Sequence, residues 1–177
     1  MSKKLCVVFP GIGYHSDKPL LYYGKKYMAE HGYDIVEVHY GKLPKGLDNA
    51  FIAGYDVAEQ QLKNVDFDKP EDIVFISKSI GTVIAAKYTR QYSIDARNIY
   101  FTPLLSTIKY ANTSCIAFHG TADPLADTCK LIDACKEKNI PLYTYEGGNH
   151  SIETGDILWN METLKDIAEK YIEYLKF

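Results

Sequence analysis

The stretch "DIVFISKSIGTVIAAKY", residues 72–88, joins an apolar run directly to a helical run that is rich in small residues. Residues 73–76 are all apolar, as in a strand that is buried on both faces of a sheet. Residues 80–92 are typical of a helix, so the junction is the short turn "SKSIG" at 77–81. Such a turn either connects two elements and nothing more, or it presents a serine side chain for chemistry.

Outside this stretch, strand-like runs alternate with helix-like runs along the whole chain. This alternation is typical of a parallel sheet with helices on both faces. We therefore expect one α/β domain over residues 1–177, a three-layer αβα sandwich around a mainly parallel six-stranded sheet. The expected strands are 4–9, 34–40, 72–77, 98–102, 114–118 and 141–146, and the expected helices are 20–30, 48–63, 80–92, 126–138 and 157–175.

The last helix carries an apolar stripe from Ile157 to Leu175 at spacings of three and four residues, which predicts one buried face. Residues 103–113, between the fourth and fifth strands, are expected to form only a short connection. We see no internal repeat, linker or low-complexity segment in the sequence.

Composition excludes several classes of function. The net charge is −3 and the lysines are scattered, so the sequence has no basic patch for nucleic acid. The apolar run at 5–9 is too short for a signal peptide, and no run approaches the roughly 18 apolar residues of a membrane span. The cysteines lack the spacing of metal ligands. We expect a cytoplasmic protein without metal, cofactor, nucleic-acid or membrane partner, and with reduced, buried thiols at Cys6, Cys115, Cys129 and Cys135.

Chemically active residue types follow the predicted strands at the point where each strand ends. "GIGYH" at 11–15 follows the first strand, and Ser79 follows the third. Asp123 follows the fifth strand, and His150 follows the sixth. Ligands of open α/β sheets bind beyond the carboxyl ends of the strands. The sequence therefore predicts that a serine, an acid and a histidine emerge at one edge of the sheet.

Along essentially its whole length, the sequence resembles the α/β-hydrolase superfamily. That family has a nucleophile in a G-x-S-x-G turn between a strand and a helix, followed by an acid and then a histidine. Here the turn is "SKSIG", the acid is Asp123 in "HGTADP", and the histidine is His150 in "GGNHS". Ser77 replaces the first glycine of the family pattern. Ser79 is the expected nucleophile because only Ser79 has a glycine, Gly81, two residues later.

The resemblance implies a role for each of these residues. Ser79 attacks an acyl carbon, His150 accepts its proton, and Asp123 orients the imidazole. The oxyanion that then develops needs fixed N–H donors. The backbone N–H of Ile80 is the first expected donor. The second is expected in the loop after the first strand, at Ile12 or, as the next choice, Gly13.

Three alternatives compete with this interpretation. Asp127 and Glu146 are other candidates for the acid, although Asp127 lies inside an expected helix. "GIG" at 11–13 also begins a dinucleotide-binding pattern, but Ser16 stands where its last glycine belongs. A turn that serves packing alone would not need the downstream acid and histidine.

The expected substrate pocket is shallow, because the connection 103–113 is too short to build a cap domain. Lys78 is expected beside the site with a solvated ammonium group, or else as an attractor for an anionic substrate. Residues 20–27 are the one segment in which a substitute lid is conceivable. The resemblance also implies a minimal family member that lacks the first two strands. The candidate pocket residues are Tyr14, His15, Lys78, Leu104 and Leu105, with His39 as a further candidate.

These features lead to one main hypothesis about function. The sequence predicts a serine hydrolase that cleaves a small acyl ester, like a carboxylesterase, through an acyl-enzyme. A thioesterase or an acyltransferase would use the same triad, so the sequence leaves both open. A binding protein on a hydrolase scaffold is the alternative from another class. The expected partner is a small-molecule acyl substrate, and the sequence does not predict an oligomeric state.

Overall fold

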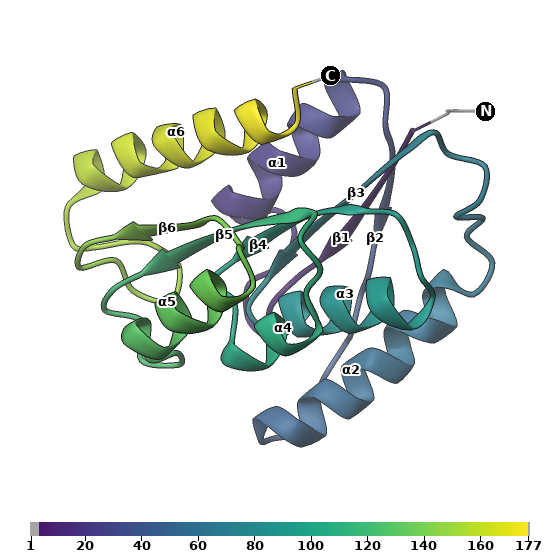
Figure 1. The fold of residues 1–177 in the computed structure, drawn as a ribbon, viewed down its shortest axis with the longest axis horizontal. Helices are drawn as coiled ribbons and strands as arrows, with labels where there is room; N and C mark the ends of the chain where they lie inside the picture. The colour runs from purple at the N-terminus through teal and green to yellow at the C-terminus, as the bar shows by residue number, and fades with distance from the viewer. Residues whose placement is uncertain (1–3, 177) are drawn as a thin grey trace.

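The computed structural model describes residues 4–176 as alternating strands and helices (Figure 1). The strands are β1 (Lys4–Phe9), β2 (Asp34–Glu37), β3 (Asp72–Lys78), β4 (Arg97–Phe101), β5 (Cys115–Gly120) and β6 (Leu142–Tyr145). The helices are α1 (Pro19–Glu30), α2 (Leu47–Leu62), α3 (Ile80–Gln91), α4 (Leu105–Tyr110), α5 (Thr128–Glu137) and α6 (Ile157–Tyr174).

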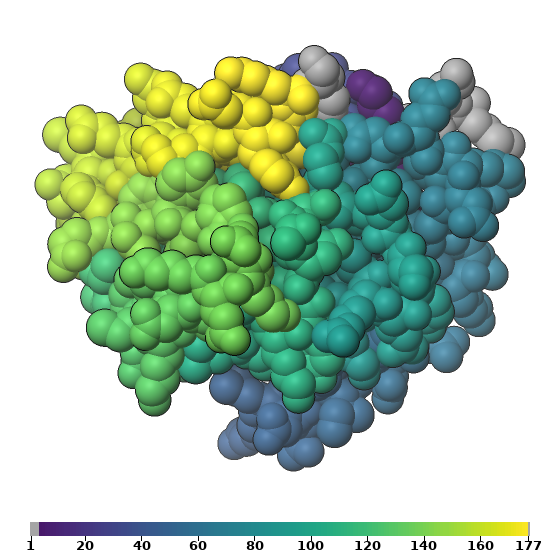
Figure 2. Space-filling model, viewed as in Figure 1, coloured from purple at the N-terminus to yellow at the C-terminus, as the bar shows by residue number. Residues whose placement is uncertain are grey.

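The six strands form one sheet in the order β2-β1-β3-β4-β5-β6, and every neighbouring pair is parallel. Helices α1 and α6 cover one face, and α2, α3, α4 and α5 cover the other (Figure 1). In the space-filling view, α6 (yellow) lies along the upper edge of the molecule and α2 (blue) along the lower edge (Figure 2). The predicted fold class, an αβα sandwich around a six-stranded parallel sheet, is confirmed.

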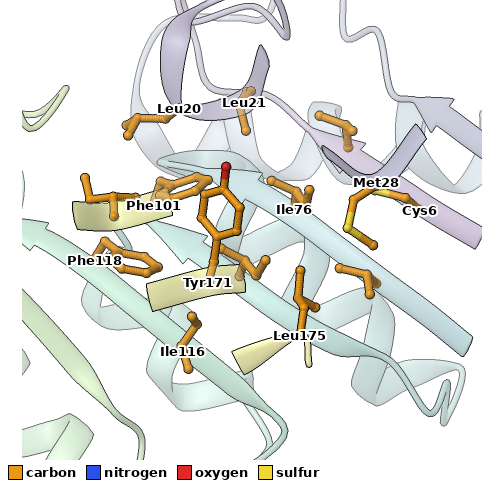
Figure 3. Close-up of a cluster of buried hydrophobic side chains, with 14 of the residues drawn as sticks. Cys6, Leu20, Leu21, Met28, Ile76, Phe101, Ile116, Phe118, Tyr171 and Leu175 are labelled. Atoms are coloured by element: carbon orange, nitrogen blue, oxygen red, sulfur yellow. The ribbon is translucent and has the colours of Figure 1, made fainter. Parts of the chain in front are cut away.

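The strands read as continuous apolar runs because each side of the sheet has its own hydrophobic core. On the α1–α6 side, Tyr171 from α6 packs among Phe101 and Phe118 of the sheet and Leu20 and Leu21 of α1 (Figure 3). On the opposite side, the helices pack on the alternate residues of the same strands, such as Phe75 of β3. Burial of both faces explains why these strands lack the alternating pattern of a half-exposed sheet.

Residues 20–27 belong to α1, which is a layer of the sandwich. Leu20, Leu21 and Gly24 are buried in it, and a Cβ added at Gly24 would lie 3.2 Å from the Cδ1 of Ile76. Because this face packs on the sheet, the segment does not form a lid over the strand ends. Tyr22 and Tyr23, which are 37% and 50% exposed, point away from the core.

The helices differ from expectation in two places. The connection 103–113 contains the short helix α4. The predicted stripe of α6 is buried only in its later turns, since Ile157 and Met161 are 71% and 65% exposed. Both residues line an open groove together with Tyr14 and Leu20, so the first turns of α6 are not packed against the layer below.

Candidate active site

The turn between β3 and α3 holds Ser79 in a backbone conformation that non-glycine residues rarely adopt. Its φ is 55° and its ψ is −124°. The backbone N–H of Ser79 donates to the carbonyl of Phe101 at 3.0 Å, and its own carbonyl accepts from the hydroxyl of Thr82 at 2.6 Å. Strained backbone of this kind is typical of functional sites, where the surrounding structure keeps it in place. The turn places the serine side chain at the carboxyl end of β3, which lies inside the sheet.

The glycine of the turn allows β1 to approach α3 closely. A Cβ added at Gly81 would lie 2.2 Å from the carbonyl oxygen of Phe9 and 2.5 Å from that of Pro10. Backbone atoms at that distance cannot move aside without shifting β1. At the opposite end of the turn, Ser77 is fully buried and its hydroxyl donates to the carbonyl of Ile99 at 3.3 Å. The serine in place of the family's first glycine therefore fits its site.

We predict that Gly81→Ala destabilises the protein by about 1–3 kcal/mol, because the added methyl group meets fixed backbone. The same shift would displace Ser79, so turnover should fall as well. Urea unfolding of both proteins checks the stability. Gly155→Ala is the matched control, since an added Cβ there meets no atom within 4 Å. Equal midpoints for the two variants would contradict the packing argument.

Three side chains from distant parts of the chain form one hydrogen-bonded line. The Oγ of Ser79 lies 2.7 Å from the Nε2 of His150. The Nδ1 of the same imidazole lies 2.7 Å from the Oδ2 of Asp123. A carboxylate only accepts, so the imidazole proton belongs on Nδ1, and Nε2 is left to accept from the serine hydroxyl. The structure thus brings together the serine, histidine and acid that the sequence singled out.

The carboxylate of Asp123 is buried and held from several directions. Its Oδ1 accepts from the N–H of Leu125 at 2.9 Å, and His119 lies 3.8 Å from Oδ2. Burial alone would raise the pKa of Asp123, but the hydrogen bonds from His150 and Leu125 outweigh it and hold the pKa below its ordinary value. Asp123 is therefore ionised at neutral pH and polarises the imidazole beside it.

The loops after β5 and β6 are tied together, which fixes Asp123 relative to His150. The N–H of Ala122 donates to the carbonyl of Gly148 at 2.9 Å. A Cβ added at Gly120 would lie 2.2 Å from that same carbonyl oxygen, so the loops approach each other only because Gly120 has no side chain. The side chain of Asn149 accepts from the N–H of Ser151 at 2.7 Å and shapes the turn around His150.

The competing acids lie away from this line. Asp127 is the N-cap of α5, where its side chain accepts from the N–H of Lys130. Glu146 is exposed and follows β6. His119 lies beyond the end of the expected strand 114–118, but it is a buried residue of β5 itself. Its Nε2 lies 2.9 Å from the hydroxyl of Thr128, so it links β5 to the start of α5.

The loop after β1 forms a tight turn close to Ser79. The N–H of Gly11 donates to the carbonyl of Tyr14 at 3.1 Å, and the N–H of Tyr14 donates back at 3.2 Å. We call residues 11–14 the oxyanion turn, because the sequence predicts an oxyanion donor at Ile12 or Gly13. A Cβ added at Gly11 would lie 3.2 Å from the Cβ of Ser79, so the turn begins beside the serine. Within residues 4–176, the backbone N–H groups of Ile12, Gly13 and Ile80 do not donate to any backbone carbonyl in the turns and loops.

The five predicted pocket residues do not share one cavity. Leu104 and Leu105 line an apolar cavity of about 320 Å³ together with Ile80 and Leu125. His15 lies elsewhere, in a cavity of about 440 Å³ that His39 and residues 11–13 of the oxyanion turn also line. Tyr14 faces away from both, because its ring is buried against the start of α1. The two cavities are separate. Ser79 lines neither of them, although its neighbour Ile80 lines the smaller one and Gly11 lines the larger one.

The expectation of a solvated Lys78 is wrong. The side chain is only 2% exposed, and its Nζ lies 4.8 Å from the centre of the Tyr14 ring. Burial lowers the pKa of Lys78 to about 8, although the charges of Asp123 and Glu153 act in the opposite direction. The lysine is at the end of β3 on the α1 side of the sheet, where the oxyanion turn covers it.

Sequence reasoning missed the threonine that supports the turn from below. The hydroxyl of Thr82 lies 2.6 Å from that of Thr107 in α4, which in turn accepts from the N–H of Leu104 at 3.1 Å. These hydrogen bonds link the start of α3 to α4, and Leu104 and Leu105 at the start of α4 line the apolar cavity. A threonine three residues after the predicted nucleophile was the only signal in the sequence.

Other classes of site find no support among the described residues. Within 4–176, no group of histidine, cysteine, aspartate or glutamate side chains is arranged to hold a metal ion. None of the helices in the same range has the length and apolar character needed to cross a membrane. Three of the four cysteines are buried as expected, but Cys129 is exposed.

Several solved structures have a similar fold. The esterase Pf2001 from Pyrococcus furiosus is 12% identical, with a TM-score of 0.72 over 99% of this chain and 83% of that one. Est1E from Butyrivibrio proteoclasticus, solved with ferulic acid, is 14% identical, with a TM-score of 0.68 over 98% and 90%. XC6422 from Xanthomonas campestris, described as an α/β serine hydrolase without a lid, is 12% identical, with a TM-score of 0.61 over 97% and 83%.

No protein-family model matches the sequence, and no curated protein matches it either. The similarity to the solved structures covers nearly the whole chain at low identity, so it defines the fold. This protein has the α/β-hydrolase fold, as the sequence resemblance predicted.

Proposed function

We propose that this protein is a serine hydrolase that cleaves small acyl esters through an acyl-enzyme on Ser79. The observation that carries the proposal is the line of two 2.7 Å hydrogen bonds from Ser79 through His150 to Asp123. The serine lies at a strained turn, beside the N–H groups of Ile12, Gly13 and Ile80, which donate no turn or loop hydrogen bond within residues 4–176. Acyl transfer needs such donors for its oxyanion. The fold that it shares with named esterases supports the same class of chemistry.

In the first half of the proposed reaction, Ser79 becomes acylated. The hydroxyl oxygen attacks the carbonyl carbon of the ester while its proton moves to the Nε2 of His150. The imidazolium that forms is stabilised by the ionised Asp123. The carbonyl oxygen becomes an oxyanion and accepts from the N–H of Ile80 and from the oxyanion turn, at Ile12 or Gly13. The C–O bond then breaks, and the leaving alcohol takes the proton from Nε2.

In the second half, water replaces the alcohol. Nε2 of His150 accepts a proton from the water, whose oxygen attacks the acyl carbon of the ester on Ser79. The same N–H groups stabilise the second oxyanion. Breaking the bond to the Oγ of Ser79 releases the carboxylic acid, and the proton on Nε2 returns to the serine.

The apolar cavity beside Ile80 suggests where a small acyl group binds. Its walls include Leu105 and Leu125, which are 40% and 49% exposed, so the cavity is open to water. Each methylene that becomes buried contributes about 0.8 kcal/mol, or roughly fourfold in affinity. Methylenes beyond the cavity would stay in water and contribute little.

We therefore predict that kcat/KM for p-nitrophenyl esters peaks near two to four acyl carbons and then flattens or falls. The measurement is a series from acetate to decanoate, with thioesters of the same acids as a matched series. A steady rise to eight or ten carbons would show a closed acyl site. Faster turnover of the thioesters would favour the thioesterase alternative.

A scaffold that only binds ligands is the alternative from another class. Such a protein would show no turnover with either series and no reaction with a fluorophosphonate, which needs an activated serine. An acyltransferase would instead form the acyl-enzyme and pass the acyl group to an added alcohol faster than to water.

A further inference from the structure

Lys78 is a buried cation that the proposed mechanism does not use. It immediately precedes Ser79, and its side chain is 2% exposed. Among residues 4–176, its ammonium group forms no hydrogen bond or ion pair. Lysines are rarely buried without an anionic partner, because the ammonium loses its hydration. Lys25, by comparison, pairs with both Asp17 and Glu37.

The side chain of Lys78 lies against both ends of the oxyanion turn. At one end, a Cβ added to Gly11 would lie 3.0 Å from the Cδ of Lys78, so the aliphatic stem fills the space below that glycine. At the other end, the Nζ lies 4.8 Å from the centre of the Tyr14 ring, within range of a cation–π interaction. One side chain therefore contacts the turn where it starts and where it ends.

Ile12 and Gly13 form the tip of the oxyanion turn, and their backbone makes few contacts. Ile12 is 57% exposed, and the tip N–H groups have no backbone partner among the described residues. Tyr14 is anchored through its hydroxyl, which accepts from the N–H of Leu20 at 3.2 Å. Lys78 lies beneath both Gly11 and Tyr14, so its side chain helps to set the distance from Ile12 and Gly13 to Ser79.

We propose that Lys78 is a positioning residue that holds the oxyanion turn against Ser79, through its stem at Gly11 and its ammonium at the ring of Tyr14. The proposal rests on the proposed function, since the turn matters only if an oxyanion forms beside it. Lys78 itself does not touch the reacting atoms. Donors placed about 1 Å from their working positions cost on the order of 10²-fold in rate, so a loosened turn should lower kcat.

The charged state of Lys78 makes the proposal testable by pH. The groups around the ammonium are Tyr14, Lys18, Asp123 and Glu153, from three loops. Burial raises the pKa of Tyr14 to about 12, so this ring stays neutral over the working range. Because the pKa of Lys78 is about 8, its charge and its attraction to the ring are lost between pH 7 and 9. Turnover should therefore fall as pH rises through about 8.

The same pKa has a consequence for stability. In the unfolded chain a lysine titrates near its ordinary value, so between about 8 and 10.5 the unfolded state binds more protons than the folded state. The buried ammonium therefore lowers stability at neutral pH, and this cost is relieved as pH rises through that window. Removing the charge should therefore raise Tm at pH 7 and lower kcat. A residue that serves only packing would not show both effects together.

The test compares wild type, Lys78→Met and Lys18→Met with p-nitrophenyl acetate from pH 6 to 10. Lys78→Met keeps the stem but removes the charge, and we expect kcat at pH 7 to fall by about 10- to 100-fold. KM should stay within about twofold, the fall in kcat above pH 8 should disappear, and Tm should rise. Lys18 is exposed, and its Nζ lies 5.8 Å from the same ring. Lys18→Met should therefore keep the wild-type kcat at pH 7 and the fall in kcat above pH 8.

Tyr14→Leu tests the same contact from the other side, and it carries the test if Lys78→Met does not fold. Because each variant removes one partner of a single contact, the double variant should lose little more kcat than either single one. Wild-type kcat and an unchanged pH profile in Lys78→Met, or fully multiplicative losses in the double variant, would overturn the proposal. A wild type without turnover or fluorophosphonate labelling would refute the proposed function instead.

Discussion

Ser79→Ala is expected to lower turnover of a p-nitrophenyl ester on the order of 10⁶-fold and to stop reaction with fluorophosphonates. The substitution removes the only atom that attacks, and it leaves the backbone turn intact because alanine meets the same strain at a φ of 55°. His150 loses its 2.7 Å partner but keeps the bond to Asp123. The measurement is the pre-steady-state and steady-state release of p-nitrophenol.

Ser77→Ala is the matched control for that variant. Ser77 lies two residues earlier in the same turn and is fully buried, and its hydroxyl donates to the carbonyl of Ile99. Its removal should leave turnover within a few-fold of wild type. Residual activity that is equal in the two variants would contradict the assignment of the nucleophile.

Asp123→Asn is expected to lower kcat by about 10⁴-fold without unfolding the protein. The Oδ1 of Asp123 accepts from the N–H of Leu125, so the oxygen of the substituted amide should take that place. Its NH₂ group then faces the Nδ1 of His150 and forces the imidazole proton onto Nε2. An Nε2 that carries a proton cannot accept one from Ser79, so the base is lost although all three side chains remain in place.

The pH-dependent kinetics of Asp123→Asn should be compared with those of Asp127→Asn and Glu146→Gln, which change the two competing acids. Asp127 caps α5, a role that asparagine also fills, and Glu146 is exposed. Both controls should keep turnover near that of wild type. If Glu146→Gln loses activity while Asp123→Asn keeps it, the acid of the triad is Glu146, after β6, and not Asp123.

The fold was predictable because its signals are local. The strand 4–9 was placed without error, since its apolar run is bounded by "PGIG" immediately afterwards. The order of serine, acid and histidine was equally visible, because each follows a strand end and all strand ends of a parallel sheet meet at one edge. Gly81 and Ser79 could be paired by spacing alone, and the close approach of Phe9 explains why a glycine is required there.

The surroundings of the site were less predictable because they depend on contacts between distant segments. Lys78 is buried by Gly11 and Tyr14, which lie more than sixty residues earlier in the chain. The sequence around Lys78 gives no sign that distant residues bury it. Because lysine is usually exposed, the residue type favoured a solvated position. The division of the pocket residues between two cavities has the same cause, since Tyr14 turns into the core to meet the N–H of Leu20.

The central claim is that Ser79 is an activated nucleophile, and identification of the modified residue tests it most directly. Wild-type protein is treated with a fluorophosphonate at neutral pH, where the serine oxygen attacks phosphorus and fluoride leaves, and the adduct is located by peptide mass spectrometry. We predict one adduct, on Ser79. An adduct on Ser77 or on any other residue, or no adduct under conditions that label a reference serine hydrolase, would contradict the claim.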